Sequence, residues 1–282
     1  MPRIPVSGRI AVSGRVPVSG RIPVARRPIV LIPGKTPFLY IDPSVSVQKT
    51  GSNVLCGLPN LAEVGRGMQS PSGTTAAQYP TVTTAGGFNS IDFNGSQLVT
   101  LSGDAALASK FSAQTNQVFF AVAKWDSVAT PFANTILSAA VGVGGGANYT
   151  LMHAATSGSA VLFGMRDTAA VKTGETAAGV ITAGQRFLLT CWFDGSGTGN
   201  AGRMKVRVNG VERALTFSGT IPAQSLTMTA ATGAIVMGTT TITGGRTLDG
   251  EVTFLQAYNV PIDYTTEVPL AEATLNRIYS IY

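Results

Sequence analysis

The sequence predicts an all-β sandwich domain that follows an extended, repetitive N-terminal arm. Two observations predict the sandwich: short runs of alternating apolar residues are separated by turn residues, and strong helix formers are few. The arm is predicted by a repeat of six residues that fills the first 27 positions. A chain of 282 residues that is 44% apolar can build one sizeable core, and β-sandwiches of this length often form a single domain.

The net charge of +6 is concentrated in the arm. Residues 1–36 carry seven Lys and Arg side chains and no acid, whereas residues 37–282 carry 13 Lys and Arg against 14 Asp and Glu. Because the body is nearly neutral, we do not expect a basic nucleic-acid-binding domain. Charged residues make up only 12% of the chain, which favours a surface partly covered by a neighbouring subunit.

Cysteine and hydropathy patterns argue against several classes of protein. Cys56 and Cys191 form neither a metal-ligand spacing nor a disulfide framework, so we expect two unpaired thiols, with Cys191 in a core strand. No window of about 18 apolar residues is present, so no transmembrane helix is expected. The N-terminus lacks the apolar region of a signal peptide, and nothing in it indicates secretion by that route.

The arm consists of four copies of a hexapeptide, beginning with Arg3-Ile4-Pro5-Val6-Ser7-Gly8. Even positions hold Ile, Val or Gly, and odd positions hold Arg, Pro, Ala or Ser, which is the two-residue period of a strand. We expect the arm to anchor the protein in an assembly. The residues expected to make the assembly contacts are Arg3, Ile4, Val6, Arg9, Ile10, Val12, Arg15, Val16, Val18, Arg21, Ile22 and Val24.

The prolines of the arm all occupy odd positions, at Pro5, Pro17 and Pro23, so only one edge of an extended arm keeps all its N–H donors. The arm could remain disordered, pair with another chain or fold back on its own domain, and the pattern favours the second. Fully extended, it would reach roughly 80 Å. Its arginines could meet an acidic protein surface, whereas nucleic acid is a poor match because aromatic residues are missing. Residues 28–36 shift register and are interpreted as a joint.

The body contains a series of expected strands, two of which are apolar on both faces, as central sandwich strands are. These two are residues 117–124 and 187–193, while residues 42–87 show little periodicity. The other expected strands are 38–41, two segments within 90–101 (91–95 and 98–101), 133–140, 149–153, 160–165, 204–211, 234–238 and 250–258.

Two local patterns are more detailed. Met204, Val206 and Val208 are expected to face inward and Lys205 and Arg207 outward, before a tight Asn209-Gly210 hairpin. The C-terminus is expected to be helical. Its helix would be capped by Thr265 or Thr266, with an apolar stripe of Leu270, Leu275, Ile278 and Tyr279.

The order of several motifs resembles concanavalin A-like (laminin-G-type) jelly rolls over residues 37–282. The motifs are Leu39-Tyr40-Ile41-Asp42-Pro43-Ser44, Tyr79-Pro80, Asn89 to Ser96, Ala123-Lys124-Trp125, Arg186 to Ser196, Arg203 to Glu212, and Leu248 to Asn259. The resemblance implies a jelly-roll sandwich with a short terminal helix. Together with the repetitive arm, it is similar to structural proteins of tailed bacteriophages, in which such domains serve as decoration, head-fibre or tail proteins.

Some members of this superfamily hydrolyse glycans with paired carboxylates, and the nearest approach here is Asp249-Gly250-Glu251. We interpret these two acids as a turn aspartate and a surface glutamate. The single histidine, His153, lies outside any nucleophile motif, and residues 142–146 lack the residues of a phosphate-binding loop. The chain is therefore expected not to be an enzyme.

Other candidate sites are interpreted as structural. Residues 194–200 are expected to form a flexible hairpin loop, with a calcium loop as the alternative, although the closing Glu is missing. Trp125 and Trp192 are expected in the core, and Tyr79 and Tyr149 are candidates for glycan contact. No catalytic, cofactor or metal site is predicted.

The leading hypothesis is a non-enzymatic structural component of a tailed phage virion, assembled in the host cytoplasm. Its partners would be coat, fibre or tail subunits bound through the arm, and it would form a homo-oligomer without membrane contact. The alternative is a carbohydrate-binding adhesin that recognises a host surface glycan. No cofactor is expected under either hypothesis.

Overall fold

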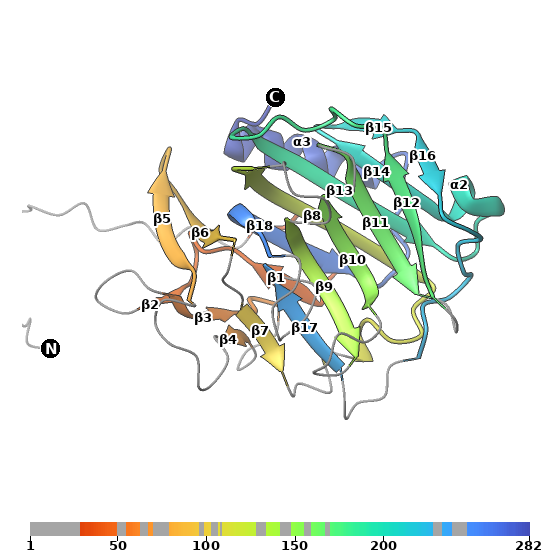
Figure 1. Ribbon diagram of the computed structural model, residues 1–282, viewed down its shortest axis with the longest axis horizontal. Coiled ribbons are helices and arrows are strands. Elements are labelled where there is room, and N and C mark those ends of the chain that lie inside the picture. The colour runs from red at the N-terminus through yellow and green to blue at the C-terminus, as the bar shows by residue number, and fades with distance from the viewer. Residues whose placement is uncertain are drawn as a thin grey trace, which may run out of the picture.

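A computed structural model describes residues 29–49, 55–62, 67–69, 79–95, 99–102, 107, 109–127, 134–141, 148–154, 159–166, 170–227, 233–238 and 247–282. Within these residues, two antiparallel sheets pack face to face (Figure 1). The predicted all-β sandwich is confirmed. Residues 1–28, with all the assembly residues predicted between Arg3 and Val24, lie outside the described residues, as does the loop 142–146.

Sheet A is built around the two strands that the sequence identified as apolar on both faces. In spatial order its strands are β15 (Val211–Arg213), β14 (Met204–Val208), β13 (Arg186–Asp194), β8 (Asn116–Trp125), β18 (Asp249–Tyr258), β6 (Phe88–Asn94) and β5 (Thr81–Ala85). A further strand, β1 (Leu39–Ile41), pairs with β18. The central position of β8 and β13 confirms the prediction from their composition.

Sheet B covers the inner face of sheet A. Its strands in spatial order are β16 (Leu215–Phe217), β12 (Val171–Thr176), β11 (Val161–Arg166), β10 (Asn148–Ala154), β9 (Thr135–Val141), β17 (Gly233–Met237), β7 (Val99–Ser102), β4 (Gly67–Gln69), β3 (Leu55–Pro59) and β2 (Gln48–Lys49). The region 42–87, for which the sequence indicated little regular structure, therefore contains β2 to β5. Strands β2 and β4 have two and three residues, which is too short to display a period of two, while the five residues of β3 include Gly57 and Pro59 and those of β5 include three threonines.

The core between the sheets is formed by alternate residues of the central strands. From β8 it takes Phe119, Ala121, Ala123 and Trp125, all of which are fully buried. Strand β13 adds Cys191, which is buried and unpaired as predicted. Burial raises the pKa of the Cys191 thiol well above its ordinary value, so this thiol stays protonated and unreactive.

A second core lies on the outer face of sheet A, beneath helix α3 (Glu267–Tyr279) (Figure 1). The intervening residues of β8, Val118, Phe120 and Val122, point into this second core. Helix α3 meets them with Val268, Ala271, Leu275 and Tyr279. The central strands of sheet A are therefore buried on both faces.

The start and the stripe of α3 differ from the prediction. Thr266 occupies the N-cap position, but its side chain makes no capping hydrogen bond. Asp263 caps instead, because its Oδ1 accepts hydrogen bonds from the backbone N–H groups of Thr265 and Thr266 at 2.7 and 3.1 Å. Leu270, which was expected in the apolar stripe, is 65% exposed.

Residues 29–36 extend the cover over sheet A. Leu31 and Ile32 are buried in the second core, and Nζ of Lys35 lies 2.5 Å from Oε2 of Glu267 at the start of α3. The segment interpreted as a joint is thus packed against the domain. The described part of the chain holds no helix long and apolar enough to cross a membrane.

A second departure from the prediction is a short helix, α2 (Gly199–Arg203), in the region expected to be a loop. The neighbouring Asp194 accepts hydrogen bonds at Oδ1 from the backbone N–H and hydroxyl of Ser196, at 2.9 and 2.6 Å. The carboxylate is thereby used in a local turn. The described residues contain no cluster of acids, His or Cys that could hold a metal ion.

The attachment of α3 can be tested with two leucines of the same helix. Leu275→Ala should lower the free energy of unfolding by about 2–5 kcal/mol, because it removes a fully buried side chain from the second core. Leu270→Ala should change it by less than about 0.5 kcal/mol. Urea denaturation followed by circular dichroism measures both, and equal losses would contradict the assignment of the buried face.

Candidate functional site

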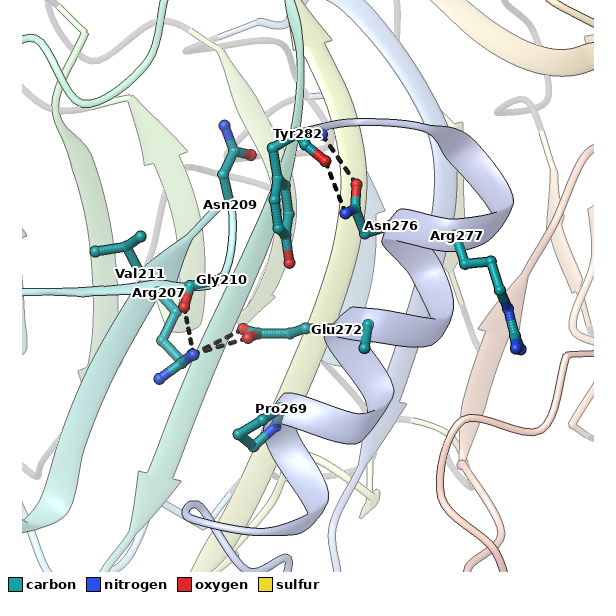
Figure 2. A pocket seen from close by; sticks show the side chains of 10 residues that line it. Arg207, Asn209, Gly210, Val211, Pro269, Glu272, Asn276, Arg277 and Tyr282 are labelled. Atoms are coloured by element: carbon teal, nitrogen blue, oxygen red, sulfur yellow. Dashed lines mark hydrogen bonds and ion pairs between the residues drawn. The ribbon is translucent and has the colours of Figure 1, made fainter.

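A groove of about 540 Å³ runs between α3 and the β14–β15 hairpin (Figure 2). One wall is formed by the hairpin residues 207–211, and the other by α3 and the chain beyond it. The lining residues are Arg207, Asn209, Gly210, Val211, Pro269, Glu272, Ala273, Asn276, Arg277 and Tyr282. The groove joins segments that lie about 60 positions apart in the sequence.

The hairpin wall follows from the sequence as predicted. Val206 and Val208 are buried in the core between the sheets, so Arg207 between them must point to the outer face, where α3 lies. Asn209 and Gly210 form the two-residue turn with φ values of 51° and 74°. Oδ1 of Asn209 accepts a hydrogen bond from the backbone N–H of Leu188 at 2.9 Å, which ties the turn to β13.

An ion pair forms the floor of the groove. Nε of Arg207 lies 3.0 and 2.9 Å from the two carboxylate oxygens of Glu272, and the same guanidinium donates a hydrogen bond to the carbonyl of Gly210. The side chain of Glu272 is only 2% exposed. Burial raises the pKa of Glu272, and the hydroxyl of Thr190 and the positive charge of Arg207 oppose this shift.

Tyr282 closes one end of the groove. Its backbone is fixed by Asn276, whose Oδ1 accepts hydrogen bonds from the N–H groups of Ile281 and Tyr282, both at 2.9 Å. Figure 2 shows its phenol directed into the groove, towards Gly210 and Glu272. A Cβ atom at Gly210 would lie 2.7 Å from the Tyr282 hydroxyl, so a glycine is required for this close approach. Tyr282 remains 54% exposed and can contact a ligand.

The two carboxylates singled out by the sequence lie elsewhere, at the start of β18. Glu251 is 13% exposed and pairs with Lys124 at 2.7 Å and Arg186 at 3.9 Å. Lys124 also contacts Asp126 at 2.9 Å. The interpretation of Glu251 as a surface residue was therefore wrong: it belongs to an ion-pair network that crosses β18, β8 and β13.

Asp92 lies directly opposite Glu251 in the pairing of β6 with β18. Burial raises the pKa of Asp92, and the charge of Glu251 raises it further. Gly250 separates Asp249 and Glu251 because a Cβ there would lie 2.0 Å from the carbonyl oxygen of Lys124. The Asp-Gly-Glu sequence is thus explained by the close contact of β18 with β8.

The remaining candidates do not line the groove. Trp125 and Trp192 are buried as predicted, on opposite faces of sheet A, and Nε1 of Trp192 donates a hydrogen bond to the carbonyl of Ile262. Tyr79 is half-buried. Tyr149 and His153 belong to β10, and their side chains lie outside the description. The sequence identified Asn209 and Gly210 only as a turn and did not identify Tyr282.

The ion pair makes a testable contribution to stability. Arg207→Met should lower the free energy of unfolding by about 3–5 kcal/mol at neutral pH, because Glu272 would remain buried and charged without its counter-ion. The loss should shrink as the pH falls. In the variant, Glu272 takes up a proton at a higher pH in the folded state than in the unfolded state, so lowering the pH stabilises the folded state. Chemical denaturation at several pH values measures this. The double variant with Arg207→Met and Glu272→Met removes the buried charge. If it were less stable than the single variant Arg207→Met, the buried charge of Glu272 would not explain the loss.

No family model and no curated protein matches the chain. Among solved structures, the chain is similar to the carbohydrate-binding module CBM40 of the Ruminococcus gnavus IT-sialidase, with 15% identity, 64% of this chain and 95% of that chain covered, and a TM-score of 0.50. Domain 4 of the arabinanase AbnA from Geobacillus stearothermophilus, in complex with arabinotriose, is 14% identical. The match covers 71% of this chain and 82% of that chain, with a TM-score of 0.46. The heptameric SAP-like pentraxin from Limulus polyphemus is 19% identical, with 64% of this chain and 79% of that chain covered and a TM-score of 0.41. The likeness to the first of these concerns the fold, which is a jelly roll.

Proposed function

We propose that the chain is a non-enzymatic carbohydrate-binding module and that its N-terminal arm attaches it to a larger assembly. The observation that carries the proposal is the groove between α3 and the β14–β15 hairpin, which presents the exposed ring of Tyr282 beside polar side chains. The shared jelly-roll frame of the Ruminococcus gnavus module supports it as an analogy of fold.

The chemistry of the groove fits a sugar. Its volume of about 540 Å³ lies within the usual range for small-molecule sites, in which a few polar groups orient a ligand against apolar walls. Pro269, Ala273 and Val211 supply apolar surface for the C–H faces of a sugar ring, and the ring of Tyr282 offers a flat contact. The amide nitrogen of Asn209 and the Tyr282 hydroxyl have no hydrogen-bond partner among the described residues, so they are available to sugar hydroxyls.

The absence of catalysis is part of the proposal. The carboxylate of Glu251 is engaged by Lys124 and Arg186, and Glu272 is engaged by Arg207. A retaining glycosidase needs two carboxyl groups about 5–5.5 Å apart with access to the substrate. The groove supplies one carboxylate that is almost fully buried, which suits binding rather than hydrolysis.

The binding role of Tyr282 can be measured on a glycan array followed by NMR titration of the best sugar. Tyr282→Ala should weaken binding about tenfold or more, equivalent to about 1.4 kcal/mol, because the flat contact surface is lost. Gly210→Ala should have the same effect by displacing the phenol. Gly179→Ala is the matched control, since Gly179 also has positive φ but its Cβ would meet nothing within 4 Å. An array without any bound glycan would count against the proposed function.

A structural role in a tailed phage virion is the second candidate, and the repetitive arm favours it. The repeat cannot bury its Ile and Val face alone, so it needs a partner surface. The root of the arm is firmly attached, because Leu31 and Ile32 are buried and Lys35 pairs with Glu267. A module held in this way could display a glycan-binding groove on a particle, as a homo-oligomer or beside coat, fibre or tail subunits.

Deletion of residues 1–27 tests the anchoring role. The truncated protein should keep its unfolding temperature, since the deleted part precedes Leu31 and Ile32, but it should be lost from purified particles. Quantitative mass spectrometry of the particles measures occupancy. Incorporation at the level of the full chain would refute anchoring by the arm, while leaving the sugar-binding proposal untouched.

A further inference from the structure

Strand β5 (Thr81–Ala85) forms an edge of sheet A (Figure 1). Among the described residues it pairs only with β6, across the two-residue turn Gly86-Gly87, whose φ values are 62° and 81°. In such a hairpin, the residue beside the turn and every second residue after it bond to the partner strand. The backbone N–H and C=O groups of the residues between them, Val82 and Thr84, therefore point away from β6 and out of the sheet.

The surroundings of β5 support this alternation. The N–H of Asn89, which lies opposite Thr84, points away from β5 and donates to Oγ of Ser44 at 2.9 Å. Val82 belongs to the core between the sheets and is buried, whereas Thr84 is exposed. The edge thus offers unpaired backbone groups beside an apolar inner face, and an edge of this kind accepts a further strand.

The outer face of sheet A is acidic next to this edge. Asp92 of β6 lies opposite Thr81, and Glu251 of β18 lies opposite Asp92. The carboxylates that repel one another here are Asp92, Asp126, Asp249 and Glu251. Two cations, Lys124 and Arg186, contact this group, so four negative and two positive charges leave a net charge of −2. None of the ion pairs between described residues includes Asp92, so the acid nearest to the edge has no counter-ion of its own.

The arm fits this edge in its alternation. Its even positions hold Ile, Val and Gly, whereas its prolines and the arginine that begins each repeat occupy odd positions. Because proline lacks an N–H group, only the edge formed by the even residues can bond to a partner throughout. In antiparallel pairing, residues that exchange backbone hydrogen bonds lie directly opposite each other on the same face. Even residues opposite Val82 and Thr84 therefore place Ile and Val on the apolar inner face and the arginines on the acidic outer face.

The charges and dimensions of the arm and the edge also agree. Residues 1–36 carry seven positive charges and no acid, which complements the acidic face beside β5. A strand added to β5 would lie about 10 Å from β6, a gap that extended arginine and Asp92 side chains bridge. The five residues of β5 span about 17 Å, which one hexapeptide of roughly 20 Å matches. The whole arm reaches roughly 80 Å, so a single edge leaves most of its repeats for other copies.

From these matches we infer that one repeat of the arm pairs antiparallel with β5 of a second copy of this chain. The inference rests on the proposed attachment by the arm, and it adds the partner and the surface to which the arm binds. The arm would then form the new edge of sheet A, with its prolines turned outward. Because prolines offer no N–H group there, no further strand would add, and each β5 would take one arm.

Sedimentation velocity of the full chain over a wide range of concentration tests the contact. The chain should associate as its concentration rises, and association should weaken with added salt. Thr84→Pro removes the outward N–H and should weaken association about tenfold or more. Thr84→Ala is the matched control, since it loses the same side-chain hydrogen bond to Asn89 but keeps the N–H, and it should associate like the unmodified chain. Dilute copies are separate, so unfolding measured at low concentration does not depend on the contact.

Hydrogen exchange followed by NMR on the unmodified chain gives a second readout if Thr84→Pro does not fold. The N–H groups of Val82 and Thr84 should exchange more slowly as the concentration rises. Protection of both groups in a chain that stays monomeric would show that the arm folds back on its own domain, and it would overturn the inference. Association that Thr84→Pro leaves unchanged, or no association at any concentration, would also overturn it. Sugar binding on the array and incorporation into particles are measured separately, so the proposed function would stand in each of these cases.

Discussion

Sheet A carries apolar side chains on both faces, and this constraint shapes the rest of the molecule. Along β8, one set of alternate residues faces sheet B and the other set faces α3. A strand with two apolar faces needs two covers, because burial of apolar surface contributes roughly 25 cal/mol per Å² and neither face can be left in water. Helix α3 and residues 29–36 together provide the second cover.

The groove is a consequence of this cover. Helix α3 is narrower than the sheet beneath it, and polar side chains of β14 emerge at its flank. Arg207 points outward there because its neighbours in the strand, Val206 and Val208, face the main core. Glu272 of α3 is thereby brought over Arg207, and the pair satisfies two charges that packing would otherwise bury alone. The same interaction fixes the helix to the sheet and sets the electrostatic character of the groove.

Sequence patterns predicted those parts of the fold in which the order of apolar and polar residues along a strand shows which of its faces are buried. Strand β14 alternates along its five residues, β8 and β13 are apolar on both faces, and the Asn209-Gly210 turn has a conformational requirement of its own. Strands β2 and β4 are too short to show any period, and the five residues of β3 and of β5 do not alternate between apolar and polar types. In α3 the apolar stripe was misplaced at one position because Leu270 and Ala271 are adjacent, and the helix buries the smaller Ala271 while Leu270 is exposed.

The groove itself could not be predicted, because its walls come from residues 207–211 and 269–282, and only the tertiary packing brings them together. Tyr282 in particular has no local pattern that distinguishes it from any other tyrosine. Its position depends on Asn276, which accepts hydrogen bonds from two backbone N–H groups beyond the helix and so turns the chain back towards Gly210. A turn glycine, a helix-ending asparagine and a tyrosine thus form one unit, in which the conformation of the hairpin determines whether the phenol can enter the groove.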